Sequence, residues 1–200
     1  MQTKISGILL SIIFIALVFL QVNCSQKQEK MAENKETHIE RGKYLVDLGG
    51  CNHCHSPKVM TAMGPVPDTT RLLSGSPDKI NSVDFDPKMV AQGKYAVCTG
   101  DLTTWFGPWG ISYAANLTPD KETGIGDWTP AIFIKALRTG KHIGEGRPIL
   151  PPMPWQDIGK LTDQDLHDIF AYLQTLKPIS NKVHDPATPD ELAKLMKKEK

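Results

Sequence analysis

Apolar residues recur at helical spacing near the C-terminal end of the chain, and this is the clearest structural pattern in the sequence. The positions that share one face are Leu166, Ile169, Phe170, Leu173 and Leu176. Thr162 precedes them with Asp165 three residues later, which is the arrangement of an N-terminal capping box. Pro178 ends the pattern because proline lacks an N–H and its ring clashes with the preceding turn. The pattern predicts a helix between Thr162 and Pro178.

Two further stretches carry helical signals. Thr129 as N-cap, Pro130 at the first helical position and Gly140 as left-handed cap define a helix over residues 130–139. Apolar positions between residues 39 and 48 predict another helix, which ends at the glycines 49 and 50. Residues 58–127 are rich in Gly and Pro and have weak strand signals, so loops with short helices are expected there. The expected fold class is all-α.

The N-terminal segment is typical of an exported chain. Lys4 is followed by an almost unbroken apolar run over residues 5–22, and Cys24 stands where a bacterial lipoprotein signal places its acylated cysteine. Gln21 departs from the aliphatic residue usual in such a signal. Three outcomes are open: lipid attachment at Cys24, an uncleaved membrane anchor, or cleavage to a soluble form. All three place the domain outside the cytoplasm.

These signals together predict four segments. Residues 1–23 are a signal peptide or membrane anchor, and residues 24–37 are a polar, flexible tether. A folded domain covers residues 38–178, and residues 179–200 form a lysine-rich C-terminal tail.

The charge balance narrows the class of partner. The chain has 23 Lys and Arg against 22 Asp and Glu, a net charge of +1. The sequence has no stripe of basic residues of the kind expected in a nucleic-acid-binding protein, and this argues against nucleic acid as a partner. Because acidic and basic residues are nearly equal in number, the net charge does not indicate whether the surface of a protein partner would be acidic or basic.

The stretch GGCNHCHSP holds the candidate chemistry, with Cys51, Cys54 and His55 in a CxxCH motif. A structural zinc site would need a second ligand pair, which the later sequence lacks. A redox dithiol is usually preceded by a strand, whereas the segment before Cys51 has helical periodicity. A covalent haem accounts for every residue: the two thiols form thioethers and His55 binds the iron. His53 between the cysteines is expected to be exposed.

A second axial ligand is predicted about a hundred residues away. Met153 lies in the loop PPMPW, which its prolines stiffen, and a thioether ligand favours ferrous iron. Met89 and His142 remain as alternatives. The other ring nitrogen of His55 is expected to donate to a backbone carbonyl, for which the Gly64–Pro65 pair is a candidate.

These motifs together resemble the class I cytochromes c, in particular the bacterial mono- and dihaem family. The resemblance rests on RGKYLVDLGGCNHCHSP, GPWGISYAANLTPDKETGIGDWTPAIFIKALRTGKH, GRPILPPMPW and DIFAYLQTL, within about residues 39–177. It implies helices wrapped around one covalently bound haem c, with Gly42 letting the first helix approach the last near Ile169 and Tyr172. It also implies that Arg147, Trp155 and His142 contact the haem propionates. The long insertion after His55 departs from the minimal family pattern, and Cys98 within it is expected to be a buried, small apolar residue.

The resemblance further implies a one-electron carrier, not an enzyme. Such a chain would be a haem subunit or redox partner of a dehydrogenase, an oxidase or other cytochromes. It would lie in the periplasm or on the outer face of a bacterial membrane, held by its N-terminus. The alternative function is a peroxidase-like haem enzyme, which would need an open position opposite His55.

Overall fold

The computed structural model describes residues 34, 37–77, 90 and 93–191. The chain divides into two units, residues 1–40 and 41–200, and the following concerns the second. The predicted signal or anchor, the acylation site Cys24 and the alternative ligand Met89 lie outside the described residues. Within the described part of the chain, no helix has the length and apolar content needed to cross a bilayer.

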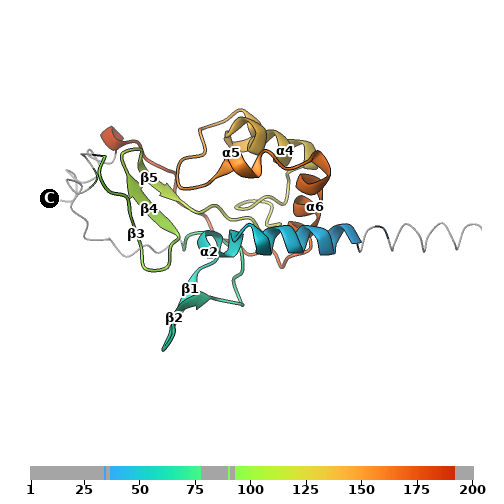
Figure 1. Cartoon of the computed structure of the whole chain (residues 1–200), viewed down its shortest axis with the longest axis horizontal. Coiled ribbons are helices and arrows are strands. Elements are labelled where there is room, and N and C mark those ends of the chain that lie inside the picture. Colours follow the sequence, from blue (N-terminus) through green and yellow to red (C-terminus); the bar gives the residue numbers. More distant parts are fainter. Residues whose placement is uncertain (1–33, 35–36, 78–89, 91–92, 192–200) are drawn as a thin grey trace, which may run out of the picture. The chain divides into compact units, whose positions relative to one another are not determined.

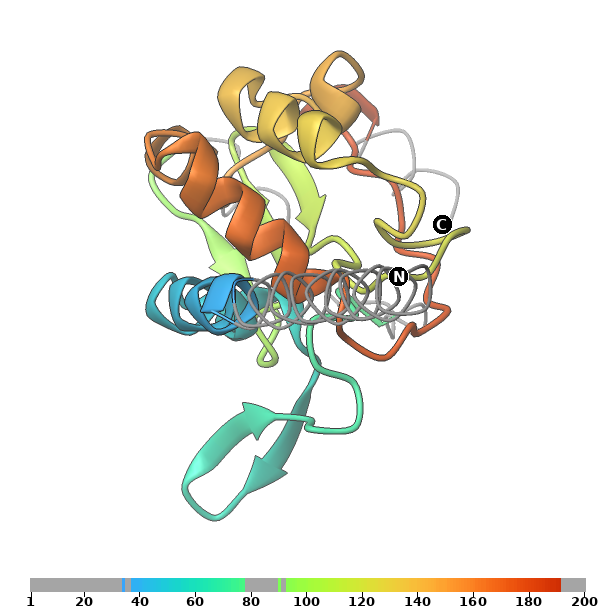
Figure 2. The ribbon, with the colours of Figure 1, turned by 90° about the vertical axis from the view of Figure 1, so that its right-hand side faces the viewer.

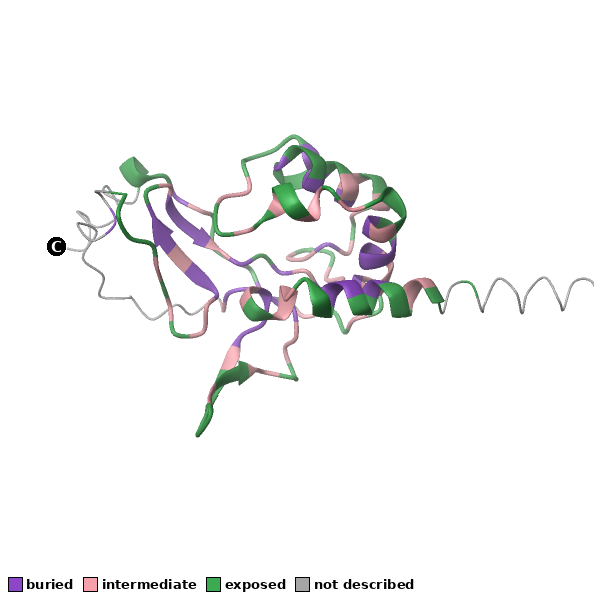
Figure 3. Ribbon diagram, viewed as in Figure 1, coloured by how far each residue is buried: buried purple, intermediate pink, exposed green. Residues whose placement is uncertain are grey.

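Helices from both ends of the unit form its main core (Figures 1 and 3). They are the N-terminal helix (residues 41–48), α2 (Cys51–His55), α4 (Pro130–Thr139), the short 3-10 helix η1 (His142–Gly144), α5 (Trp155–Ile158) and α6 (Asp163–Leu173). The buried residues of this core are Leu45, Val46, Leu73, Ile125, Phe133, Leu137, Leu166, Ile169, Phe170 and Leu173. The apolar stripe predicted for α6 is therefore its buried face, with Leu176 packed at the edge of the core.

The predicted helix caps of α4 and α6 are confirmed. The Thr129 hydroxyl accepts a hydrogen bond from the Ile132 N–H at 3.3 Å, and Gly140 ends α4 with φ 65°. The Thr162 hydroxyl accepts from the Asp165 N–H at 3.1 Å. Each threonine hydroxyl satisfies a backbone N–H that has no partner within the helix. Local sequence thus fixes where both helices begin.

Gly42 lets the N-terminal helix pack directly on α6. A Cβ at this position would lie 1.9 Å from the Asp168 carbonyl oxygen and 2.9 Å from the Tyr172 Cβ. The close approach to Tyr172 is as predicted, whereas the tightest contact is with Asp168 instead of Ile169. A backbone this near leaves no room for any side chain.

The insertion between His55 and α4 contains strands, so the all-α expectation is confirmed only for the helical core. Strands β1 (Lys58–Thr61) and β2 (Gly64–Pro67) form one antiparallel hairpin. Strands β3 (Val97–Cys98), β4 (Thr104–Gly107) and β5 (Gly110–Tyr113) form a three-stranded antiparallel sheet in the order β3-β4-β5. These strands have two to four residues between glycines and prolines, too few to produce a clear alternation in the sequence.

The two sheets differ in their surroundings. The β3–β5 sheet has a small core of its own, formed by Val90, Phe106, Ile111 and Ala187. The β1–β2 hairpin projects away from the rest of the unit, as Figure 2 shows. Met60 and Met63 on this hairpin are 76% and 95% exposed. Neither methionine packs in the core.

Part of the segment after α6 is packed, although the sequence analysis assigned residues 179–200 to a C-terminal tail. Asn181 is buried, and its side-chain amide donates to the carbonyls of Ser74 at 2.7 Å and Ser76 at 2.8 Å. Ala187 pairs with Ile111 at the edge of β5. The packed domain therefore continues well past residue 178. The reason is that the buried polar groups of one segment are satisfied by the other.

We expect Gly42→Ala to lower the free energy of unfolding by about 2–3 kcal/mol, because the new methyl group would force the N-terminal helix off α6. Denaturant unfolding of the two proteins measures the difference. Gly100→Ala is the matched control, since no atom of the described residues lies within 4 Å of a Cβ there. Equal midpoints for Gly42→Ala and Gly100→Ala would show that the two helices do not depend on this contact.

Candidate haem-binding site

His55 is the best-defined residue of the predicted site. It is the last residue of α2 and is buried, and its Nδ1 lies 2.8 Å from the carbonyl oxygen of Ala115. A carbonyl can only accept, so Nδ1 carries the proton and Nε2 keeps a free lone pair. Burial lowers the pKa of His55, against the opposing effect of the Ala115 carbonyl. The imidazole is thus neutral, which is the form that binds metals.

The two cysteines of the motif share a helical face with His55. In α2, Cys51, Cys54 and His55 stand at positions i, i+3 and i+4, which are neighbours on one side of a helix. Both thiols are free and half-buried, and burial raises the pKa of each. Cys51 also packs against the main core. One helical turn therefore presents two protonated thiols and one neutral imidazole together.

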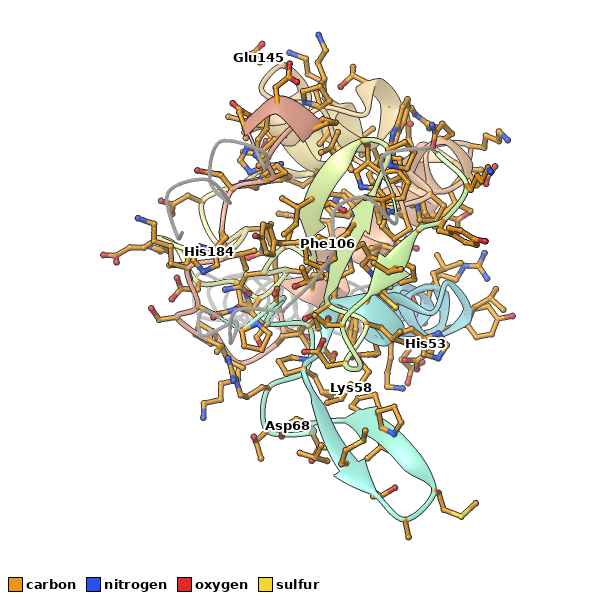
Figure 4. All side chains as sticks on the ribbon, turned by 90° about the vertical axis from the view of Figure 1, so that its left-hand side faces the viewer. His53, Lys58, Asp68, Phe106, Glu145 and His184 are labelled. Atoms are coloured by element: carbon orange, nitrogen blue, oxygen red, sulfur yellow. The ribbon has the colours of Figure 1, made fainter. Side chains whose placement is uncertain are left out.

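Lys58 closes the C-terminal end of α2, a role that the sequence did not indicate. Its ammonium group donates to the carbonyls of Asn52 at 3.2 Å, His53 at 2.9 Å and Ser56. A cation suits the negative end of a helix, and these bonds connect α2 to β1. Partial burial lowers the pKa of Lys58. His53 itself is exposed, as predicted, and Figure 4 shows it beside Lys58.

Met153 belongs to the same core as the motif. It is half-buried and packs, like Cys51, against the main cluster of apolar residues. Its loop leads directly into α5, where the Pro154 carbonyl accepts from the N–H groups of Asp157 at 3.0 Å and Ile158 at 3.1 Å. The assignment of Met153 as iron ligand stays a prediction.

The three residues predicted to contact haem propionates lie close in the chain but have partners of their own. The His142 N–H donates to the Arg147 carbonyl at 2.9 Å, and the His142 ring packs edge-on against Trp128. The Arg147 guanidinium lies 3.8 Å from the Asp185 carboxylate. Burial lowers the pKa of both His142 and Arg147. Their contacts with propionates stay a prediction.

Trp155, the third of these residues, begins α5. A Cβ on Gly140 would lie 2.3 Å from its ring, so the indole packs directly over that glycine. Gly140, which ends α4, therefore also makes room for the indole of Trp155, two positions after Met153.

Two expectations about the insertion are wrong. The carbonyl that accepts from His55 belongs to Ala115, whereas Pro65 lies in β2 opposite Met60. The acceptor is sixty positions from His55, and no local spacing points to it. Cys98 is exposed on β3 instead of buried. Partial burial and the nearby Asp101 carboxylate raise the pKa of its thiol.

The residues present fit a c-type haem. Cys51 and Cys54 offer the thiols for two thioether bonds, and the hydrogen bond to Ala115 leaves Nε2 of His55 available for iron. Met153 offers a half-buried thioether as the second ligand. Cys51 and Met153 both pack against the main apolar core.

Comparison with known proteins defines the class. The model of the cytochrome c family matches residues 39–177, and the chain belongs to this family. It is 30% identical over 136 residues to the cytochrome c subunit of the quinone-dependent alcohol dehydrogenase of Gluconobacter oxydans, covering 59% of this chain and 28% of the relative. It is 28% identical over 152 residues to the cytochrome c subunit of gluconate 2-dehydrogenase of Pantoea cypripedii, covering 76% and 26%. A dihaem c-type cytochrome of Cereibacter sphaeroides is 30% identical over 151 residues, covering 74% and 40%.

The chain thus spans no more than 40% of the length of these three relatives. Family membership confirms the expectation of a cytochrome c-like domain and of an electron-transfer protein.

We expect Gly75→Ala to disturb the support of His55. Gly75 has φ 81° and donates its N–H to the His55 carbonyl at 2.7 Å, and a Cβ there would lie 2.7 Å from the Ala114 oxygen and the Ala115 carbonyl carbon. The methyl group would push the Ala115 carbonyl away from Nδ1. Nitrogen-15 NMR of the His55 ring should then show loss of the single Nδ1–H tautomer.

Gly93→Ala serves as the control for backbone strain in this test, since Gly93 also has positive φ (68°) but no atom of the described part of the chain lies within 4 Å of a Cβ there. Gly75→Ala should lose about 2 kcal/mol more unfolding free energy than Gly93→Ala. An unchanged His55 tautomer in Gly75→Ala would contradict the proposed support.

Proposed function

We propose that this chain is a monohaem cytochrome c subunit that passes single electrons between a dehydrogenase and a later acceptor. The observation that carries the proposal is His55, with Nδ1 bonded to the Ala115 carbonyl and Nε2 left free, on the same helical face as two free thiols. A single CxxCH motif in the sequence supports one haem.

The residues of this chain would hold the haem from both sides. Cys51 and Cys54 would form the thioether bonds, His55 would bind the iron through Nε2, and Met153 would bind it from the opposite side. Haem supplies a one-electron ferric/ferrous couple. Arg147, His142 and Trp155 would contact the propionates, where Asp185 would compete for the Arg147 guanidinium.

The protein's part in electron transfer is to keep the ligands in one arrangement and to limit water. With Nδ1–H donated to Ala115 and Nε2 bound to iron, His55 would have no free ring nitrogen at which to take up a proton during the cycle. The buried side chains of the main core, among them Phe133 and Phe170, supply the apolar surface against which Cys51 and Met153 pack. A low-dielectric environment and a thioether ligand both favour the ferrous form.

The partner and location follow from the relatives and the N-terminus. Two of the compared relatives are named as cytochrome c subunits of alcohol and gluconate dehydrogenases, which supports a dehydrogenase as the electron donor. The apolar run before Cys24 supports export to the periplasm and attachment at the outer face of a membrane, through a lipid on Cys24 or an uncleaved helix.

Mass spectrometry of the chain purified from bacterial membranes tests the covalent cofactor. We expect one haem mass on the peptide that contains Cys51 and Cys54, and loss of the covalent mass in the double variant Cys51→Ala/Cys54→Ala. Cys98→Ala is the control and should keep the haem, since its thiol is not part of the motif. Two haem masses, or none on the exported wild-type chain, would refute the monohaem assignment.

Met153→Ala tests the second ligand. The ferric wild-type protein should be low-spin with the weak far-red absorption band of thioether ligation, and the variant should lose the band and become high-spin. Met153→His should stay low-spin with a lower reduction potential, within the ~0.8 V range that axial ligands span. Met60→Ala is the control, because Met60 is exposed on the hairpin. A high-spin wild-type protein that reacts rapidly with peroxide would instead favour the peroxidase-like function.

A further inference from the structure

One extended segment, residues 112–115, contacts both the proposed ligand His55 and the loop that carries Met153. At its far end the Ala115 carbonyl accepts from His55 Nδ1 at 2.8 Å. Three residues earlier, in β5, the Ser112 hydroxyl donates to the Pro151 carbonyl at 2.6 Å. Pro151 stands two positions before Met153. His55 and the Met153 loop are therefore attached to the same short segment, which runs from Ser112 in β5 to Ala115 just beyond it, although they are about a hundred residues apart in sequence.

The Ser112 hydroxyl has only one direction in which to donate. Ser112 is 8% exposed, and its oxygen accepts from the Trp109 indole N–H at 3.3 Å. Its backbone is fixed by pairing with Trp105 in the β4–β5 ladder. With the oxygen accepting from Trp109, its proton points to the Pro151 carbonyl. A buried hydroxyl fixed in this way makes a directional bond.

The methionine loop has few hydrogen bonds of its own. Pro151, Pro152 and Pro154 lack an N–H, so within residues 151–154 only Met153 has a backbone donor. On the downstream side, the Pro154 carbonyl is held by the first turn of α5. On the upstream side, the bond nearest to Met153 is the one from Ser112 to Pro151. Ile149 is bonded to Gly140 two residues before that.

We propose that Ser112 is a positioning residue for the Met153 sulfur, and that the segment from Ser112 to Ala115 sets the two axial ligands relative to each other. The inference rests on the proposed His55/Met153 ligation. Without the hydroxyl, the Pro151 carbonyl loses its partner and the loop gains freedom to move. Met153 then leaves the iron more readily, while the bond of His55 to Ala115 is unchanged.

The test uses the full-length, haem-loaded protein and its Ser112→Ala and Ser112→Thr variants. Azide binding to the ferric protein reports how easily Met153 is displaced, and the pH at which the far-red band disappears reports the same step independently. We expect Ser112→Ala to bind azide about tenfold more tightly and to lose the band about one pH unit lower, as the loss of one buried hydrogen bond predicts. Ser112→Thr keeps the hydroxyl and should restore both values.

Ser76→Ala is the matched control. It removes another buried hydroxyl, which bonds to the Thr104 hydroxyl in β4 at 3.1 Å and accepts from the Thr103 hydroxyl at 3.4 Å. It should leave azide affinity and band unchanged. The positioning role is overturned if Ser112→Ala folds, binds haem and has the azide affinity of the wild-type protein. It is also overturned if Ser76→Ala shifts the azide affinity as much as Ser112→Ala does. A wild-type protein without the far-red band would instead overturn the proposed ligation, so the two failures are distinguishable.

Trp109→Phe removes the donor to the Ser112 oxygen and should shift the azide affinity in the same direction as Ser112→Ala, by a smaller factor.

Discussion

The hydrogen bond from His55 Nδ1 to the Ala115 carbonyl is the interaction on which the proposed site depends. It selects the tautomer, fixes the ring plane and leaves Nε2 as the nitrogen that can bind iron. It forms because two segments sixty residues apart approach closely at Gly75, whose N–H bonds the His55 carbonyl and whose missing side chain admits the backbone of residues 114–116. A backbone carbonyl is a suitable partner, since it cannot donate and does not titrate.

The helical frame holds this arrangement from the other side. The N-terminal helix meets α6 at Gly42, and their buried faces join those of α4 around Val46, Leu166 and Phe133. The motif follows the N-terminal helix after only two residues, so the position of that helix determines where the thiols and the imidazole lie. Lys58 at the other end of α2 connects the motif to the insertion.

The insertion has a structural role at the proposed site. Its β3–β5 sheet has a separate core, and the segment from Ser112 in β5 to Ala115 just beyond it contacts both His55 and the Met153 loop. Small cytochrome domains need rigid axial ligands, because any movement of a ligand between the two oxidation states slows electron transfer. Ser112 belongs to β5, whose pairing with β4 restrains such movement better than a loop does, since its backbone groups are already paired. The packed segment at residues 181–187 strengthens the same region through Asn181 and Ala187.

The sequence by itself determined the features that depend on neighbouring residues. Thr129, Gly140 and Thr162 define helix ends through local hydrogen bonds, and the spacing of Cys51, Cys54 and His55 defines one helical face. Only the tertiary structure decided the features that depend on distant backbone groups. The partner of His55 is Ala115 and not Pro65, the strands of the insertion pair across glycine turns, and Ser112 reaches the Met153 loop. The physical reason is that a carbonyl has no side-chain identity, so its use as an acceptor leaves no mark on the residue type that carries it.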